Sequence, residues 1–122
     1  MTTKELGDLG EKMACEYLVE KGFKILGKNY RITFGEIDII AKRDKTIHFV
    51  EVKAMADNGY NFAPEEHVDY RKQRKLRQMA QIWLEKNKYR QDAAYQIDII
   101  GILANQNTRV AKLHYFPNAV EG

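Results

Sequence analysis

The sequence predicts an α/β domain in which a helix, three strands, a second helix and one or two further strands follow one another. Two stretches, residues 3–21 and Pro64 to about Lys88, repeat apolar residues at helical spacing, whereas the runs between them and after them alternate or are rich in β-branched residues. The 122 residues are 44% hydrophobic and contain neither a repeat nor a linker. We therefore expect residues 1–122 to form a single domain around one core.

The first helix and the first strand are predicted from apolar spacing and glycine positions. Gly22 suits the position just after a helix end. Residues 23–26 and 29–32 then predict a first strand, which Gly27 interrupts and bends. The apolar stripe of the helix consists of Leu6, Leu9, Met13, Tyr17 and Leu18.

A hairpin of two strands follows, over residues 35–41 and 46–53, with polar residues between them. If Asp44-Lys45 forms a symmetric two-residue turn, Asp38 pairs with Glu51. Directly paired residues hold their Cβ atoms roughly 5 Å apart. Two carboxylates at this separation repel each other unless a positive group lies between them, and a divalent cation with oxygen ligands is the natural candidate.

Lys53 shares a strand face with Glu51, because side chains alternate in direction along a strand. Ile47 and Phe49 lie on this same face. A face that is apolar at one end and charged at the other favours a partly buried cleft over a solvent-facing polar stripe. His48 points to the opposite face, and we interpret it as an ordinary sheet residue rather than a general base.

The second half of the chain predicts a loop, a helix and two strands. Residues 55–63 are polar and without periodicity, and Pro64 suits the first turn of the helix that follows. Residues 95–103 form a buried strand and residues 110–116 a short edge strand. Asp98 lies within this buried strand, where either a catalytic role or pairing with a basic residue would explain a carboxylate. The apolar stripe of the helix is Val68, Leu76, Met79 and Trp83.

The second helix also carries the candidate nucleic-acid contacts. The formal net charge is only +3, but residues 71–77 hold five positive charges and no negative one. Such runs are usually solvated helix faces, yet they are also the electrostatic footprint of phosphate binding. Tyr60 and Phe62, in the preceding loop, either stack on an unpaired base or fold back on the core. The cations are Arg71, Lys72, Arg74, Lys75 and Arg77.

Several classes of protein are not expected. No run of eighteen apolar residues predicts a membrane span, and the first residues lack the apolar stretch of a signal peptide. Cys15 is the single cysteine and has no intramolecular disulfide partner, so we expect a cytoplasmic protein. A zinc site is not expected, because Cys15, His48, His67 and His114 are scattered.

Asp38 followed by Glu51-Val52-Lys53 resembles the PD-(D/E)xK nuclease signature, although Ile37 replaces the proline that gives the signature its name. The resemblance spans roughly residues 4–104 and identifies the chain as similar to the YraN-type uncharacterised protein family, itself similar to archaeal Holliday-junction resolvases. In that family Gly-Glu-Ile-Asp takes the place of the proline motif. The matching segments are Gly10–Ala14, Asn29–Arg31, Gly35–Asp38, Phe49–Lys53, and Lys72-Gln73 followed by Ala80 and Leu84.

The resemblance implies a restriction-endonuclease-like α-β-β-β-α-β core, with a mixed central sheet flanked by helices. It also implies an endonuclease that hydrolyses DNA, branched or single-stranded, with Mg²⁺ or Mn²⁺ held by Asp38 and Glu51. By resemblance Glu11 is a further ligand, although by composition it is a solvated helix residue. Lys53 would then orient the water or stabilise the transition state.

Further contacts and partners follow from the same resemblance. Lys72 and Gln73 resemble the family's Lys-Gln pair and are expected near the scissile phosphate, and Arg31 is a further candidate contact with DNA. Resolvases that cut paired strands act as homodimers, although no segment of this sequence marks a dimer interface. The alternative is a non-catalytic nucleic-acid-binding module that retains a nuclease fold.

Overall fold

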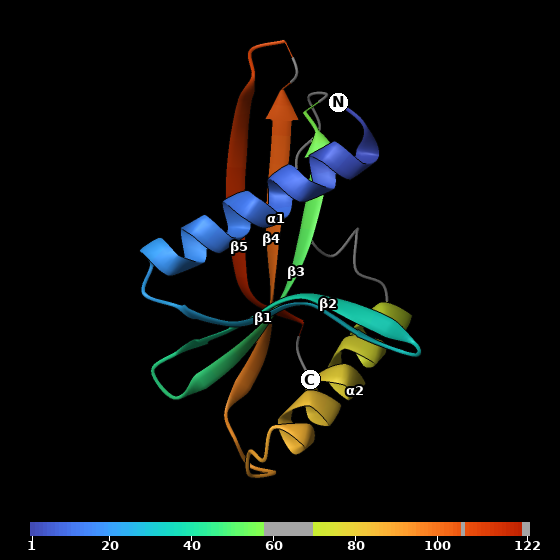
Figure 1. Ribbon diagram of the computed structural model, residues 1–122, viewed down its shortest axis with the longest axis vertical. Helices are drawn as coiled ribbons and strands as arrows, with labels where there is room; N and C mark the ends of the chain where they lie inside the picture. Colours follow the sequence, from blue (N-terminus) through green and yellow to red (C-terminus); the bar gives the residue numbers. More distant parts are fainter. Residues whose placement is uncertain (58–69, 106, 121–122) are drawn as a thin grey trace.

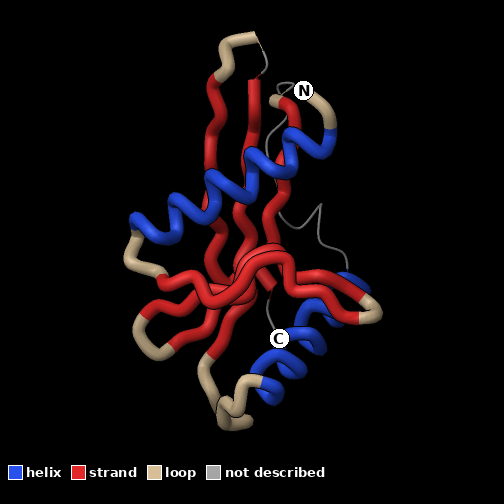
Figure 2. Tube along the Cα trace, in the orientation of Figure 1, coloured by secondary structure: helices blue, strands red, loops and turns tan. Residues whose placement is uncertain are grey.

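The computed structural model describes residues 1–57, 70–105 and 107–120 (Figure 1). It confirms the predicted α/β class and the restriction-endonuclease-like order of elements. Two helices and five strands are described, and Figure 2 distinguishes them by colour. In chain order they are α1 (Thr3–Glu20), β1 (Lys24–Ile32), β2 (Gly35–Arg43), β3 (Thr46–Ala56), α2 (Tyr70–Lys86), β4 (Tyr95–Asn105) and β5 (Val110–Val120).

The strands form one mixed sheet in the order β1-β2-β3-β4-β5. All neighbours are antiparallel except β3 and β4, which run parallel. A parallel pair needs a long crossover connection, and the segment that contains α2 supplies it. The β1–β2 hairpin turns steeply away from the direction of β3, β4 and β5 (Figures 1 and 2).

The β2–β3 hairpin has the predicted register. Arg43 pairs with Thr46, which leaves Asp44-Lys45 as a two-residue turn, and the pairing continues to Ile39 with Val50. Asp44 adopts a positive φ of 55°, a conformation that Asp tolerates better than most residues in turns. The turn therefore sets the pairing that brings the two acidic segments together.

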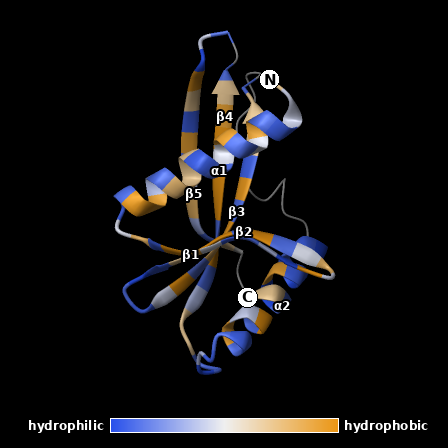
Figure 3. Cartoon of the chain, in the orientation of Figure 1, coloured by the Kyte–Doolittle hydropathy of each residue, from blue (hydrophilic) through white to orange (hydrophobic). Residues whose placement is uncertain are grey.

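The two helices cover opposite faces of the sheet, and each has its own core cluster. Side chains of α2 pack with those of β2, β3 and β4 on one face, and side chains of α1 pack on the other face. Both helices carry hydrophobic and hydrophilic bands in Figure 3, as amphipathic surface helices do. Buried members on the α2 side include Ile40, Phe49, Leu76, Met79 and Trp83; those on the α1 side include Ala14, Leu18, Ile39, Val50 and Ile100.

Helix α1 lies unusually close to the sheet at Gly10. A Cβ atom at this position would lie 2.9 Å from the Cβ of Ala54 on β3. Only glycine allows this approach without a shift of helix or strand. The helix ends one residue before the predicted boundary, and Gly22 has a φ of 92°, as expected for the residue that terminates a helix. Gly10 thus fixes the height of α1, including Glu11, above the sheet.

Three boundaries differ from the prediction. Helix α2 ends at Lys86 rather than Lys88, because Lys88 adopts a positive φ of 62° that a helix cannot continue. Strand β3 continues to Ala56, into the predicted loop. Strand β5 continues to Val120 rather than ending at Phe116. An edge strand accommodates Pro117 at a register irregularity.

Some predictions fall outside the described residues. The start of the second helix at Pro64, its apolar residue Val68 and the loop aromatics Tyr60 and Phe62 are among these. Gly27 lies where the pairing of β1 with β2 shifts register, in agreement with the predicted bend. Within the described ranges, neither helix combines the length and the apolar composition that a membrane span requires.

Candidate active site

Asp38 lies on β2 where the pairing with β3 ends. The last residue pair of the hairpin is Ile39 with Val50, so the predicted pair of Asp38 with Glu51 lies just beyond the paired residues. The Oδ2 atom of Asp38 accepts a hydrogen bond of 2.7 Å from the backbone N–H of Val52. This bond holds the carboxylate beside β3 instead of leaving it in solvent.

Glu51 is a buried carboxylate that contacts two ammonium groups. Its exposed fraction is 6%. The Nζ atom of Lys53 lies 3.4 Å from Glu51 Oε1, on the shared strand face that the sequence predicts. The Nζ atom of Lys72, which comes from α2, lies 2.5 Å from the same oxygen. Two strands and one helix thus bring together two acids and two lysines.

The two carboxylates interact unfavourably. Burial of Asp38 is the main reason that its pKa rises to about 7, and the nearby charge of Glu51 raises it further. The hydrogen bond from Val52 opposes this rise, because it favours the ionised form. Near neutral pH the pair therefore has a marked tendency to gain a proton or a cation.

The two lysines respond differently to this environment. Burial lowers the pKa of Lys53, and the neighbouring Lys72 lowers it further. Burial also acts to lower the pKa of Lys72, but its contact with Glu51 outweighs burial and the pKa is raised. Lys72 is therefore the cation that Glu51 binds most directly, whereas Lys53 loses its proton more easily than an ordinary lysine.

Glu11 belongs to a neighbouring acidic group rather than to the Asp38–Glu51 pair. With its amide nitrogen turned toward them, Asn29 lies 2.6 Å from Glu11 Oε1 and 2.8 Å from Glu36 Oε1. Burial raises the pKa of Glu11, and the charge of Glu36 adds to this effect. Both glutamates also raise the pKa of Asp38 through space. Glu11 thus acts on Asp38 electrostatically.

The donor set of Asp38 and Glu51 fits a Mg²⁺ or Mn²⁺ ion. Mg²⁺ is commonly held by one or two carboxylates and keeps several waters. A cation would also relieve the repulsion that raises the pKa of Asp38. Among the described residues no group of three Asp, Glu, His or Cys side chains is arranged to hold a metal ion. Glu11 as a third ligand therefore stays a prediction.

The predicted nucleic-acid contacts separate into inner and outer groups. Lys72 and Gln73 are half-buried, and Lys72 reaches the acidic pair. Arg71, Arg74 and Lys75 are exposed on the surface of α2, while Arg77 is half-buried. The exposed side chain of Arg31 pairs with Glu36 at 3.2 Å, near the β1–β2 turn.

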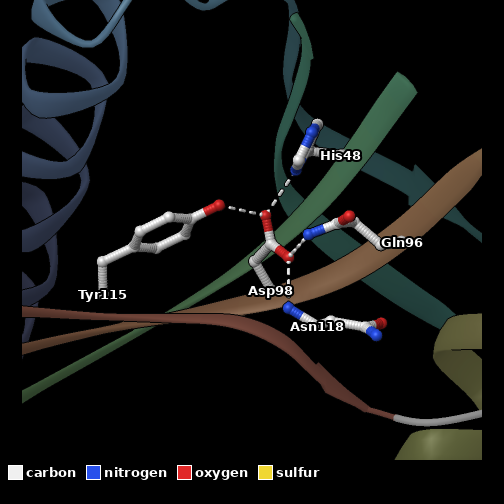
Figure 4. A network of polar contacts seen from close by, with 5 residues as sticks. All are labelled: His48, Gln96, Asp98, Tyr115 and Asn118. Atoms are coloured by element: carbon white, nitrogen blue, oxygen red, sulfur yellow. Dashed lines mark hydrogen bonds and ion pairs between the residues drawn. The ribbon is translucent and has the colours of Figure 1, made fainter. Parts of the chain in front are cut away.

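Asp98 has a structural explanation. It is fully buried, and His48 Nδ1 lies 2.6 Å from its Oδ2 atom (Figure 4). The hydroxyl of Tyr115 donates to the same oxygen at 2.7 Å, and Gln96 and the backbone of Asn118 donate to the other. These four contacts lower the pKa of Asp98 against the effect of burial. The pairing with a basic residue is confirmed, and its partner is His48.

Residues 10–102 match the sequence model of a family described as Uncharacterised protein family UPF0102. The matched range contains both acids and both lysines of the site. The chain belongs to the UPF0102 family. The resemblance to the YraN-type proteins is thereby confirmed, and the description of the family states no activity.

UPF0102 relatives match the chain over most of its length. A UPF0102 protein of Dictyoglomus turgidum is 38% identical over 119 residues, which are 98% of this chain and 99% of the relative. One from Clostridioides difficile is 43% identical over 84% of this chain and 88% of its own length. One from Mycobacterium avium is 42% identical, covering 84% and 80% respectively.

Sequence reasoning assigned no role to two residues that the structure places near the site. Asn29 and Glu36 form a polar bridge with Glu11, and the charge of Glu36 raises the pKa of Asp38. Both lie in segments that carry the resemblance to the UPF0102 family. Glu36 also lies two residues before Asp38 on a predicted strand. A spacing of two residues places Glu36 on the same predicted strand face as Asp38, and this was the sequence signal that could have predicted its role.

Proposed function

We propose that this UPF0102 protein is a divalent-metal-dependent endonuclease that hydrolyses DNA phosphodiester bonds. The observation that carries the proposal is a pair of acids, the half-buried Asp38 and the buried Glu51, with Lys53 and Lys72 beside them. Placing two acids that repel each other at buried or partly buried positions costs stability. A fold that retains such a pair next to exposed cations has the charges needed to bind a metal ion and a phosphate.

Asp38 and Glu51 would hold the ion, which when bound would lower the pKa of a coordinated water and offset negative charge on the phosphoryl oxygens. Val52 orients the Asp38 carboxylate through its backbone N–H. Burial lowers the pKa of Lys53, so this residue gives up a proton more readily than an ordinary lysine and suits the attacking water or the leaving oxygen. Lys72 suits a non-bridging phosphate oxygen, since it remains charged.

A cleavage panel tests this function. Fluorescent single-stranded, duplex, flap and four-way DNA are incubated with the protein in Mg²⁺, in Mn²⁺ and in EDTA. We expect metal-dependent cleavage of at least one substrate, with loss of cleavage in Glu51→Gln. Glu85→Gln is the matched control, because Glu85 is an exposed glutamate near the far end of α2. Cleavage that survives in Glu51→Gln would contradict the assigned site.

A nucleic-acid-binding module without catalysis is the second candidate. The contact of Lys72 with Glu51 favours it, because this ammonium already compensates the buried acid. Two measurements distinguish the functions. A binding module would retain affinity for DNA, but it would neither cleave DNA nor bind Mn²⁺ at Asp38 and Glu51.

A further inference from the structure

Phe34 is an exposed aromatic side chain at the tip of the β1–β2 hairpin. Ile32 pairs with Gly35, so Thr33 and Phe34 form a two-residue turn. The exposed fraction of Phe34 is 41%. Turn positions usually favour Gly, Asn, Asp or Pro for conformational reasons, and neither turn residue has a positive φ. The backbone therefore does not require phenylalanine here.

The hairpin tip is held against α2 at a fixed distance from the acidic site. A Cβ atom at Gly35 would lie 2.7 Å from Met79 Sδ. Met79 follows Lys72 by seven residues, so both lie on one face of the helix, roughly 10 Å apart along its axis. Because Lys72 contacts Glu51, Gly35, the residue next to Phe34, lies against the side of α2 that faces the site. Figure 1 shows the hairpin tip beside the first turns of α2.

A second exposed aromatic side chain begins α2. Tyr70 has an exposed fraction of 68%, and the guanidinium carbon of Arg74 lies 5.8 Å from the centre of its ring. Arg71 and Lys75 are exposed on the same helix, whose first turn contains no acidic residue. An exposed aromatic side chain and exposed cations therefore lie together at the start of α2, the helix that also contributes Lys72 to the acidic site.

This combination fits a single nucleic-acid strand better than a duplex. The phosphates of either form would pair with the cations. Only unpaired bases can also stack on aromatic side chains, because the bases of a duplex already stack on one another. An apolar protein partner would cover Phe34 but would leave the cations without a complementary charge. Charge complementarity thus selects a nucleic acid, and stacking selects its single-stranded form.

We propose that Phe34 and Tyr70 stack on unpaired bases of DNA whose phosphates follow the exposed cations of α2. This inference rests on the proposed nuclease function and narrows its substrate to DNA with a single-stranded segment beside the scissile bond. Phe34 lies four residues from Asp38, at most about 13 Å along the strand. This separation corresponds to about four nucleotides of a helically stacked strand.

Binding without metal tests the inference separately from cleavage. Fluorescence anisotropy in EDTA measures the affinity for a fluorescein-labelled 20-nucleotide strand and for the corresponding duplex. Phe34→Ala and Tyr70→Ala should each weaken single-strand binding by about 5- to 150-fold, and should leave duplex binding within about twofold. Val19→Ala and Val110→Ala are matched controls, since both valines are exposed apolar residues on other elements.

Crosslinking supplies a direct readout. A strand that contains 5-iododeoxyuridine, irradiated in the complex, should crosslink to Phe34 or Tyr70, as mass spectrometry of the peptides would show. Unchanged single-strand affinity in both variants, or equal losses for strand and duplex, would overturn the inference. A change in sedimentation of Phe34→Ala at unchanged DNA affinity would also overturn it, in favour of a protein contact.

The inference and the proposed function can fail independently. If the parent cuts no DNA but Phe34→Ala still loses single-strand affinity, the nuclease function fails and the stacking surface stands. If the parent cuts DNA in a metal-dependent manner and both aromatic variants bind strands normally, only the stacking surface fails.

Discussion

Lys72 lies with its Nζ atom 2.5 Å from Glu51 Oε1, in a position that a metal ion bound to Glu51 would have to share or displace. A divalent cation at the proposed site would bind the same carboxylate as the ammonium of Lys72. The two would therefore be linked, each weakening the binding of the other.

Replacement of Lys72 by methionine should strengthen Mn²⁺ binding, by about tenfold or more, because the ion no longer competes with an ammonium. Titration calorimetry of parent and variant measures this affinity. Lys75→Met removes the same charge from an exposed position of α2 and should change the affinity much less. Equal gains in both variants would mean that only the net charge matters and that the contact with Glu51 does not compete.

Asp38→Asn should stabilise the metal-free protein at alkaline pH. The pKa of Asp38 is raised from 3.8 to about 7, so the folded state holds a proton that the unfolded chain releases above about pH 4. The parent therefore loses stability relative to the variant as the pH rises from 4 to 7. Above pH 7 the difference should be at most about 4 kcal/mol, since one pKa unit corresponds to about 1.4 kcal/mol.

Urea denaturation of both proteins in EDTA at pH 4, 6 and 8 checks this dependence. The curves should nearly coincide at pH 4 and separate progressively at higher pH. Asp8→Asn is the control, because Asp8 is an exposed residue of α1. A difference that is constant with pH would show that the Asp38 carboxyl titrates normally.

Lys53→Met should abolish most cleavage and retain the metal. Lysine acts on water or phosphate, whereas carboxylates bind the ion. Loss of general acid or base assistance typically lowers rates by about 10²- to 10⁴-fold. Single-turnover cleavage and Mn²⁺ calorimetry separate the two effects. A variant that cuts at the parent's rate, or that no longer binds Mn²⁺, would contradict the role assigned to Lys53.

Asp98→Asn should destabilise the fold without changing the chemistry. The variant amide would face four donors, His48, Gln96, Tyr115 and Asn118, and breaking such a buried pair costs about 3–5 kcal/mol. The pKa of Asp98 is lower in the folded state than in the unfolded chain, where it is about 3.9. Its contribution to the stability of the fold is therefore complete above that unfolded pKa and is lost as the pH falls through the folded pKa.

Denaturation at pH 7 and at pH 3 measures how much Asp98 contributes to stability. Asp98→Asn should lose more stability at pH 7 than at pH 3. Tyr115→Phe should lose less, about 1–2 kcal/mol, because only one hydrogen-bond donor is removed. Mn²⁺ affinity should match that of the parent. A loss of metal binding in Asp98→Asn at full folding would give Asp98 a role in the site.

The part of the site that lies within the hairpin could be predicted from the sequence. A two-residue turn fixes the register, which runs to Ile39 with Val50 and so leads Asp38 toward the segment of Glu51 and Val52. Strand alternation then places Lys53 beside Glu51. These relationships are local, so turn length and the period of two are sufficient to determine them.

The contacts that depend on packing between distant elements could not be predicted in the same way. Lys72 reaches Glu51 because α2 packs against this face of the sheet, and the only signal was a lysine within the apolar arc of the helix. The pairing of Asp98 with His48 depends on the parallel register of β3 with β4, which no short turn fixes. The bridge from Glu11 through Asn29 depends on the height of α1 above the sheet.

The most direct test is to measure Mn²⁺ binding by titration calorimetry, in the parent and in the double variant Asp38→Asn/Glu51→Gln. Matching circular dichroism spectra show that both samples are folded. Asp8→Asn/Glu16→Gln is the control, because it removes two acids from exposed positions of α1. We expect binding in the parent and the control, and no binding in the double variant. Equal Mn²⁺ affinity in all three proteins would contradict a metal site at Asp38 and Glu51, and with it the proposed nuclease function.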